Sequence, residues 1–282
     1  MKVALVTDST ADLPPGWAEA HGVRVVPLYL FLDGKTYKDG VDITPDDLIQ
    51  AVQSGKKIPT TSQPTPEDFR RAYADALKEA DHVLSIHISS KLSGTVRSAS
   101  LAASEFSGKV SVFDTLAASA GIGLMVMRAH ELLSSGATLP RVQRELERIR
   151  DDQLLRFSVA TLEFLQKNGR IGKAAALVGS FLRIKPILTL NQGVVEPAGR
   201  ARGEKKALME MVKAFKAWAE GKPKVRAAFL YAGNPEAVLP LKEALFATSL
   251  PIEEVYTGKI GAVITSHVGP GTYGYYAYAL ES

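Results

Sequence analysis

The sequence predicts an α/β protein with two domains, and three observations support this prediction. In the first half, short apolar runs alternate with helical patterns, which is typical of a parallel sheet covered on both faces. After Asp151-Asp152 the pattern changes to hairpins mixed with helices. The 282 residues are enough for two domains of ordinary size. We therefore expect an N-terminal parallel α/β sheet domain over residues 1–152 and a C-terminal α+β domain with a mixed sheet over residues 153–282.

In the first domain, apolar runs bounded by polar turns predict the strands, and amphipathic stretches predict the helices. Two helices have clear start signals, since Thr44-Pro45 and Thr65-Pro66 each combine an N-cap residue with a proline at the first helical position. The predicted strands are Val3 to Val6, Val23 to Leu32, His82 to Ile88 and Lys109 to Phe113. The predicted helices are Trp17 to His21, Thr44 to Gln53, Thr65 to Ala80, Val96 to Phe106, Ala118 to Leu133 and Pro140 to Arg150, with a loop from Lys56 to Pro66.

In the second domain, Asn191-Gln192-Gly193 is a turn signal between two apolar runs and predicts a hairpin. The other predicted strands are Arg156 to Thr161, Val225 to Tyr231, Ile252 to Thr257, Ala262 to Ser266 and Tyr273 to Leu280. Helical segments are expected at Leu162 to Lys167, at Ala174 to Leu182, along the stripe from Leu208 to Trp218, and from Asn234 to Ala247.

The composition indicates a soluble globular protein and excludes several kinds of chemistry. Hydrophobic residues make up 46% and charged residues 23% of the chain. The absence of cysteine excludes thiol catalysis, disulfides and Cys-ligated metals. The first apolar run is too short for a signal peptide, and no segment approaches the roughly 18 uncharged residues of a membrane span. We therefore expect a cytoplasmic protein.

The loop from Ser89 to Thr95 is the strongest candidate binding site. It follows a predicted strand and precedes a predicted helix, where α/β sheets usually hold ligands. Free backbone N–H groups and the helix dipole favour an anion there. The hydroxyls of Ser89, Ser90, Ser93 and Thr95 add neutral donors, and Gly94 permits close approach of a ligand. The alternative is that Ser93 and Gly94 only begin the helix.

Three other loops carry candidate residues. Thr60 to Pro64 gathers hydroxyls that either point at a ligand or only form a turn and N-cap. His267 stands beside Gly269-Pro270-Gly271 and either donates to an anion or is an ordinary surface histidine. Arg170, in the turn after Asn168, either contacts an anion or is solvated.

Carboxylates at the ends of predicted strands are a weaker signal. Asp8, Asp12 and Asp114 occupy positions where catalytic acids and metals often lie, but such residues also serve as ordinary loop caps. No histidine pair or paired-carboxylate spacing supports a metal site, so we expect none.

Several nucleotide and hydrolase motifs are absent. The sequence has no phosphate-binding loop of the G-x-x-x-x-G-K-[ST] type, no complete dinucleotide fingerprint and no G-x-S-x-G nucleophile elbow. A Ser93–His267–Asp8 triad remains an arrangement to test, because these residue types can form one without the elbow.

Five motifs in order give the chain a resemblance to the DegV family, and together they cover essentially its whole length. One matches less closely, because the usual Lys-Gly-Gly-Arg-Ile appears as Lys167-Asn168-Gly169-Arg170-Ile171. The five motifs are Asp8 to Pro14, Thr61 to Pro64, Ser90 to Thr95, Gly169 to Ile171 and His267 to Gly271.

The resemblance implies a two-domain protein that binds a long-chain fatty acid and needs no cofactor. It implies that a separate ATP-dependent kinase phosphorylates the carboxylate to an acyl phosphate for phospholipid synthesis, so the chain itself is a fatty acid kinase subunit without independent catalysis. By the same resemblance, Thr61, Ser93 and His267 hold the carboxylate. Supporting contacts to the head group or partner are assigned to Ser62, Gly94, Thr95 and Arg170. The main alternative is a lipid-active serine hydrolase using Ser93 and His267.

The basic excess belongs to one segment. Gly199 to Arg226 carries nine Lys or Arg residues against three Glu residues, a local net charge of +6, whereas the rest of the chain sums to −2. Arg200 to Arg226 is thus a candidate contact to an anionic membrane, with a solvated basic helix as the alternative. Nucleic acid is not an expected partner, because the segment lacks interleaved aromatic residues and a recognisable reading motif.

Overall fold

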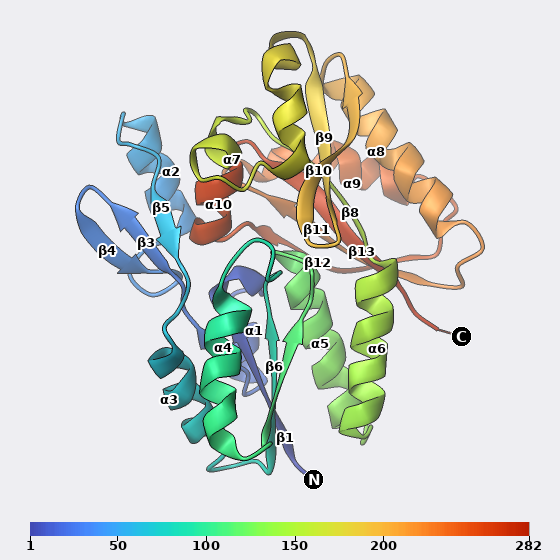
Figure 1. Ribbon diagram of the computed structural model, residues 1–282. Coiled ribbons are helices and arrows are strands. Elements are labelled where there is room, and N and C mark those ends of the chain that lie inside the picture. The colour runs from blue at the N-terminus through green and yellow to red at the C-terminus, as the bar shows by residue number, and fades with distance from the viewer. Residues whose placement is uncertain (282) are drawn as a thin grey trace.

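Four strands of the N-terminal half form a parallel sheet in the order β2-β1-β6-β7. The computed structural model describes residues 1–281, without the side chains of residues 180–183. Helices cover both faces of this sheet, α3 and α4 on one and α5 and α6 on the other (Figure 1). The strands are β1 (Val3–Asp8), β2 (Arg24–Val26), β6 (His82–His87) and β7 (Val110–Asp114). The helices are α3 (Pro66–Ala76), α4 (Thr95–Ala103), α5 (Ala120–Ser134) and α6 (Leu139–Asp152).

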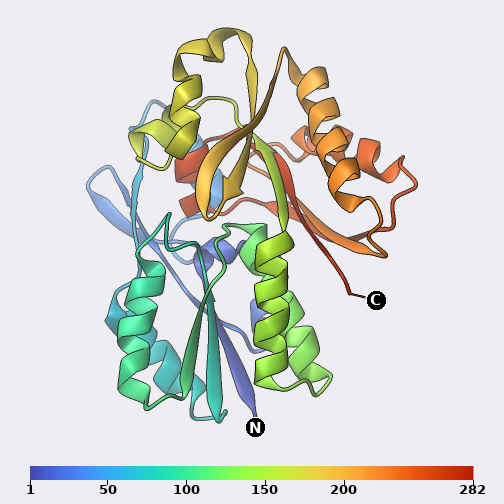
Figure 2. The same cartoon turned by 45° about the vertical axis from the view of Figure 1, so that its right-hand side comes forward.

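The second half of the chain forms a six-stranded mixed sheet in the order β10-β9-β8-β13-β11-β12. Only the pairing of β11 with β12 is parallel. Helices α8 and α9 lie on one face of this sheet, at the end of the molecule away from β1 (Figure 2). The strands are β8 (Leu154–Ser158), β9 (Lys185–Asn191), β10 (Val194–Ala201), β11 (Val225–Tyr231), β12 (Ile252–Lys259) and β13 (Tyr273–Ala279). The helices are α7 (Glu163–Lys167), the 3-10 helix η3 (Gly172–Arg183), α8 (Glu204–Ala219), α9 (Leu239–Phe246) and α10 (Ala262–Val268).

A small antiparallel sheet in the order β4-β3-β5 lies beside the other two. Its core joins the two halves of the chain, because Leu48 and Ile49 of α2 pack with Ala262 and Val263 of α10. The elements are β3 (Tyr29–Leu32), β4 (Lys35–Lys38), β5 (Thr60–Ser62) and α2 (Pro45–Gln53). Short helical turns complete the chain at α1 (Trp17–Ala20), η1 (Ser9–Ala11), η2 (Ser104–Phe106) and η4 (Pro235–Ala237).

The predicted fold class is confirmed, but three local predictions are wrong. The expected strand from Val23 to Leu32 is two strands in different sheets, separated at Pro27, which has no N–H for a sheet ladder. The loop predicted from Lys56 to Pro66 contains β5, paired with β3. The expected strand from Ala262 to Ser266 is helix α10. Its β-branched residues favour a strand, but Ser266 bonds back to the carbonyl of Ala262 and the helix packs against α2, so tertiary contacts override propensity.

The two large sheets share one hydrophobic core. Ile122 and Met125 of α5 belong to the same buried cluster as Tyr276 of β13. The turn between β9 and β10 also reaches the N-terminal half, where the Ser89 hydroxyl donates to the carbonyl of Gly193 at 3.0 Å. We retain the division into residues 1–152 and 153–282 as a proposal. Within residues 1–281, no helix has the length and apolar character needed to cross a bilayer.

Candidate functional site

A cavity lies where the three sheets meet. It contains about 1090 Å³ of space free of protein atoms, including the solvent-open space at its mouth. Most of its wall is hydrocarbon, from core strands, from α10 and from the loop after β6. The apolar lining residues include Leu28, Ile88, Leu92, Leu155, Phe157, Leu165, Leu190, Val195, Leu230, Ile260, Val263, Ile264 and Val268.

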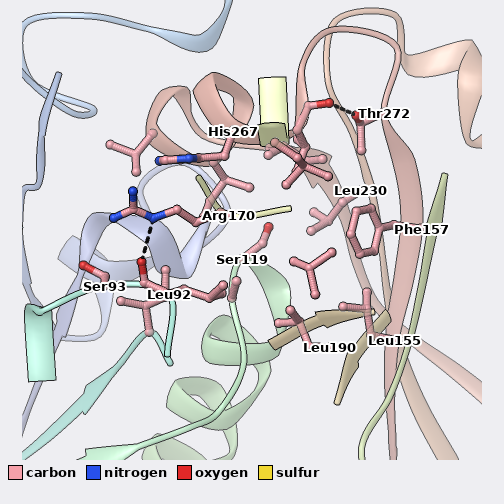
Figure 3. Close-up of a pocket in the computed structure, with 18 of the residues that line it drawn as sticks. Leu92, Ser93, Ser119, Leu155, Phe157, Arg170, Leu190, Leu230, His267 and Thr272 are labelled. Carbon is pink, nitrogen blue, oxygen red and sulfur yellow. Dashed lines mark hydrogen bonds between the residues drawn. The ribbon is translucent and has the colours of Figure 1, made fainter. Parts of the chain in front are cut away.

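Polar side chains gather at one end of this cavity. Figure 3 shows Ser93, Arg170 and His267 close together there, while Leu155 and Leu190 lie at the other end. Thr61, Ser62 and Gln63 also line the cavity, and these three come from β5 and the residue after it. The structure thus brings together residues from the small sheet, the loop before α4, the turn after α7, and α10.

His267 is the most constrained of these residues. Its Nε2 atom lies 2.8 Å from the hydroxyl oxygen of Thr61, whereas its buried Nδ1 has no hydrogen-bond partner among the described residues. Burial lowers the pKa of His267 to about 4, and the nearby positive charge of Arg170 contributes in the same direction. The imidazole is therefore neutral at pH 7 and acts as a hydrogen-bonding group rather than a charge.

Ser93 is positioned by the start of α4. Its hydroxyl lies 2.9 Å from that of Thr95 and accepts the Thr95 backbone N–H at 3.3 Å. Thr95 is buried and, like Gly94, lies behind the cavity wall rather than in it. The lack of a side chain at Gly94 makes room for the Gln63 side chain, because a Cβ atom at position 94 would lie 2.2 Å from Oε1 of Gln63. Of the hydroxyl-bearing residues in this turn, only Ser93 lines the cavity.

Arg170 brings a positive charge to the cavity mouth. Its Nε donates to the carbonyl of Leu92 at 3.1 Å, and its Nη1 donates to the carbonyl of Asn168 at 2.7 Å. Among the described residues it has no carboxylate partner. The exposed guanidinium is thus held by neutral carbonyls and keeps its charge available to a ligand.

Two features of the site were not predicted. Buried Asn168 donates to the carbonyls of Pro59 and Ser266 at 3.1 and 2.8 Å, which ties the segment before Thr61 to α10. Its place in the Lys167 to Ile171 motif was the only available signal. Tyr276 also lines the cavity, but its segment reads as an ordinary buried strand in the sequence. Ser119 lines it too, within the stretch Ala118 to Met127 that the sequence offers as a candidate lining, with an ordinary core helix as the alternative.

The strand-end carboxylates of Asp8, Asp12 and Asp114 do not line the cavity. Asp8 is fully buried and pairs with Nδ1 of His87 at 2.9 Å, so it does not orient His267. No hydrogen bond joins Ser93 to His267 in the part of the chain that is described. The contacts required for a Ser93–His267–Asp8 triad are therefore absent. Residues 1–281 also contain no group of three or more His, Asp or Glu side chains placed to hold a metal ion.

Known proteins are similar to this chain in both sequence and fold. Residues 2–280 match the family described as "Uncharacterised protein, DegV family". The chain belongs to the DegV family. A DegV domain-containing protein of Deinococcus radiodurans is 46% identical, with 97% of each chain covered. A fatty acid-binding protein of Thermotoga maritima is 36% identical over 100% of this chain and 99% of its own. A solved structure on the fatty acid binding of a DegV family protein from Thermus thermophilus is 59% identical, with a TM-score of 0.97, covering 99% of this chain and 100% of that one.

Proposed function

We propose that this DegV family protein binds one long-chain fatty acid, with the acyl chain in the cavity and the carboxylate at its polar end. The observation that carries the proposal is the asymmetry of the cavity, which has long hydrocarbon walls and a cluster of hydrogen-bonding groups beside a single cation. The DegV proteins of Thermus thermophilus and Thermotoga maritima described as binding fatty acids support it.

The energetics require the tail to dominate affinity. Burying about 14 methylenes at ~0.8 kcal/mol each contributes about 11 kcal/mol before ordering costs. A neutral hydrogen bond contributes only about 0.5–1.5 kcal/mol net. A cavity lined mostly by leucine, isoleucine, valine and phenylalanine is suited to this division of roles.

Thr61, Ser93 and His267 are assigned to the carboxylate in this proposal. Thr61 and His267 already share a hydrogen bond, and Ser93 faces the same end of the cavity. Neutral donors leave the carboxylate nucleophilic, whereas a bidentate arginine pair would hold its charge tightly. Arg170 and Ser62 support the head group at the mouth, while Gly94 and Thr95 shape the turn that carries Ser93.

The carboxylate is the reactive group in the second part of the proposal. A separate ATP-dependent kinase supplies the phosphoryl group, since this sequence has no phosphate-binding loop. A carboxylate oxygen attacks the γ-phosphorus, ADP leaves, and the product is an acyl phosphate for phospholipid synthesis. The chain acts as the lipid-binding subunit in the cytoplasm, without catalysis of its own.

Transient contact with an anionic membrane completes the proposal. Of the basic segment, Lys222, Lys224 and Arg226 are paired with Asp152, Glu253 and Glu131. The remaining basic side chains are exposed and lack an ion-pair partner among the described residues: Arg200, Arg202, Lys205, Lys206, Lys213 and Lys216. They are the part of the segment available to anionic lipid.

The test is extraction of lipid from the purified protein, followed by mass spectrometry, and calorimetric titration of delipidated protein with palmitate. We expect a long-chain acid in about equimolar amount and uptake on titration. The proposal fails if no long-chain acid is extracted and none is bound. Addition of a fatty acid kinase and ATP then tests for acyl phosphate separately.

A further inference from the structure

Besides Thr272 and Tyr275, whose hydroxyls donate to backbone carbonyls, Ser119 and Tyr276 bring hydroxyl groups to the cavity wall. Ser119 and Tyr276 both line it, and both are buried. They lie next to each other, since the backbone N–H of Ala118 donates to the Tyr276 hydroxyl at 3.2 Å and Ser119 follows Ala118 in the chain. Figure 3 shows the Ser119 hydroxyl pointing into the cavity, between Arg170 at the polar end and Leu190 at the far end. These hydroxyls are therefore distinct from the head-group cluster.

Ser119 is held in place at a conformational cost. Its backbone has φ +54° and ψ −134°, which side-chain-bearing residues rarely adopt. Such strain tends to persist at ligand-contacting positions, where the surroundings enforce it. The surroundings here include a hydrogen bond between the Ser119 hydroxyl and the buried carboxyl of Asp12.

Both hydroxyls keep unused hydrogen-bonding capacity. Burial raises the pKa of Asp12 well above its usual value. The Ser119 hydroxyl donates to this carboxyl, so its own oxygen keeps acceptor sites free. Tyr276 accepts from Ala118, and no acceptor for its own proton is found in the described part of the chain. A hydroxyl has one donor and two acceptor sites, so each side chain can bind one further group.

We propose that Ser119 and Tyr276 form a second polar contact for the ligand, which selects a long-chain fatty acid carrying a hydroxyl group part-way along its chain. This inference rests on the proposed function and adds the substrate class to it. A methylene at this depth leaves the unused proton of Tyr276 and the unused acceptor sites of Ser119 facing hydrocarbon. A chain hydroxyl accepts the Tyr276 proton and donates its own proton to the Ser119 oxygen, which satisfies all three groups.

The position of the hydroxyl along the chain gives a sharp test. Delipidated protein is titrated with stearate and with stearates hydroxylated at carbon 3, 7, 10 or 12. One isomer should bind about 2- to 10-fold more tightly than stearate, the gain from about one net hydrogen bond. The isomers that place the hydroxyl against plain hydrocarbon should bind about 10-fold or more weakly, because a buried hydroxyl without a partner is costly.

Variants identify the wall residues responsible. Ser119→Gly removes the hydroxyl and suits the positive φ, so it is compatible with folding. Tyr276→Phe removes the second hydroxyl independently. Each should lower the ratio of hydroxystearate to stearate affinity for the preferred isomer by about 3- to 10-fold. The matched controls are Ser158→Ala and Tyr278→Phe, whose buried hydroxyls contact the Pro186 carbonyl and Arg226 outside the cavity, and these should keep the wild-type ratio.

The outcomes separate the two proposals. If stearate binds but every hydroxystearate binds more weakly, the polar contact is refuted while fatty acid binding stands. The inference is also overturned if the preferred isomer keeps its advantage in both Ser119→Gly and Tyr276→Phe. If no acid binds at all, the proposed function itself is wrong.

Discussion

The two ends of the cavity are built in different ways. The polar end comes from short segments at the ends of secondary-structure elements, with Thr61 on a three-residue strand, Ser93 before α4 and Arg170 after α7. The apolar end comes from side chains on long core strands, such as Phe157 on β8 and Leu190 on β9. In the proposed function, the chemistry at the polar end depends on a few side-chain groups, whereas affinity at the apolar end depends on the integrity of the protein core.

The largest effect is expected from a charge at the apolar end. Leu190→Asp places a short carboxylate in the hydrocarbon wall, and an acyl chain packed against it removes the water that solvates the charge. Because an unpaired buried charge costs several kcal/mol, we expect palmitate affinity to fall by about 100-fold or more. Isothermal titration calorimetry measures the loss.

Leu239→Asp is the matched control, since Leu239 is exposed on α9 and does not line the cavity. Thermal unfolding of both variants shows whether Leu190→Asp is folded. Undiminished palmitate affinity in folded Leu190→Asp would place the acyl chain elsewhere.

A smaller effect on binding is expected at the polar end. Thr61→Ala and Ser93→Ala each remove one neutral hydrogen bond, so palmitate affinity should fall by only about 2- to 10-fold. Acyl phosphate formation with a fatty acid kinase should fall further, because in the proposed function these hydroxyls orient the reacting oxygen as well as bind it. The measurement is the titration together with a kinase assay at saturating palmitate.

Ser90→Ala serves as the control in the same loop, where the residue is exposed and faces away from the cavity. Equal losses in binding and in phosphorylation would contradict the assignment of Thr61 and Ser93 to the carboxylate.

The difference between the two ends also explains what the sequence predicted. Thr61, Ser93, Arg170 and His267 stand in motifs that the sequence predicts as loops, where each residue has a functional interpretation beside an ordinary structural one. Phe157, Leu190 and Tyr276 are indistinguishable in sequence from core residues, because lining a cavity and filling a core require the same hydrophobicity. Only the relative position of the three sheets decides between these roles.

The prediction for α10 failed for a related reason. The run from Ala262 to Ser266 is rich in β-branched residues and favours a strand when read locally. Its packing against α2, more than 200 positions earlier in the chain, makes it a helix and thereby sets the direction of His267. No local pattern contains that contact, so the identity of His267 as a candidate was predictable while its placement was not.

Acid should destabilise the polar end through His267. Its pKa of about 4 in the folded protein lies below the ordinary ~6.5, so the unfolded state binds more protons between these values. The stabilisation is therefore present above pH 6.5 and is lost as the pH falls toward 4. Between pH 7.5 and pH 5, wild type should lose up to about 2 kcal/mol more than His267→Gln in free energy of unfolding.

Urea denaturation of both proteins at the two pH values checks this. The comparison cancels the buried carboxyls of Asp12 and Asp39, whose pKa values burial raises in both proteins. Parallel pH profiles would mean that the imidazole is as well solvated in the folded state as in the unfolded one.

The smallest effect is expected from Gly94→Ala. The backbone of Gly94 has φ −75°, which alanine adopts without strain, so the only obstacle is the Gln63 side-chain amide. That amide is the flexible end of an exposed side chain, held by one long contact to Ser98 at 3.4 Å, and can move aside. We expect a change below about 1 kcal/mol in free energy of unfolding and below about 3-fold in palmitate affinity.

Gly193→Ala is the contrasting variant, since it combines φ +79° with a Cβ position 2.2 Å from the buried Ser89 hydroxyl. It should cost more than about 1 kcal/mol in free energy of unfolding. If Gly94→Ala loses more palmitate affinity than Gly193→Ala, the position of Gln63 matters at the polar end. Gln63 would then join the residues assigned to the ligand.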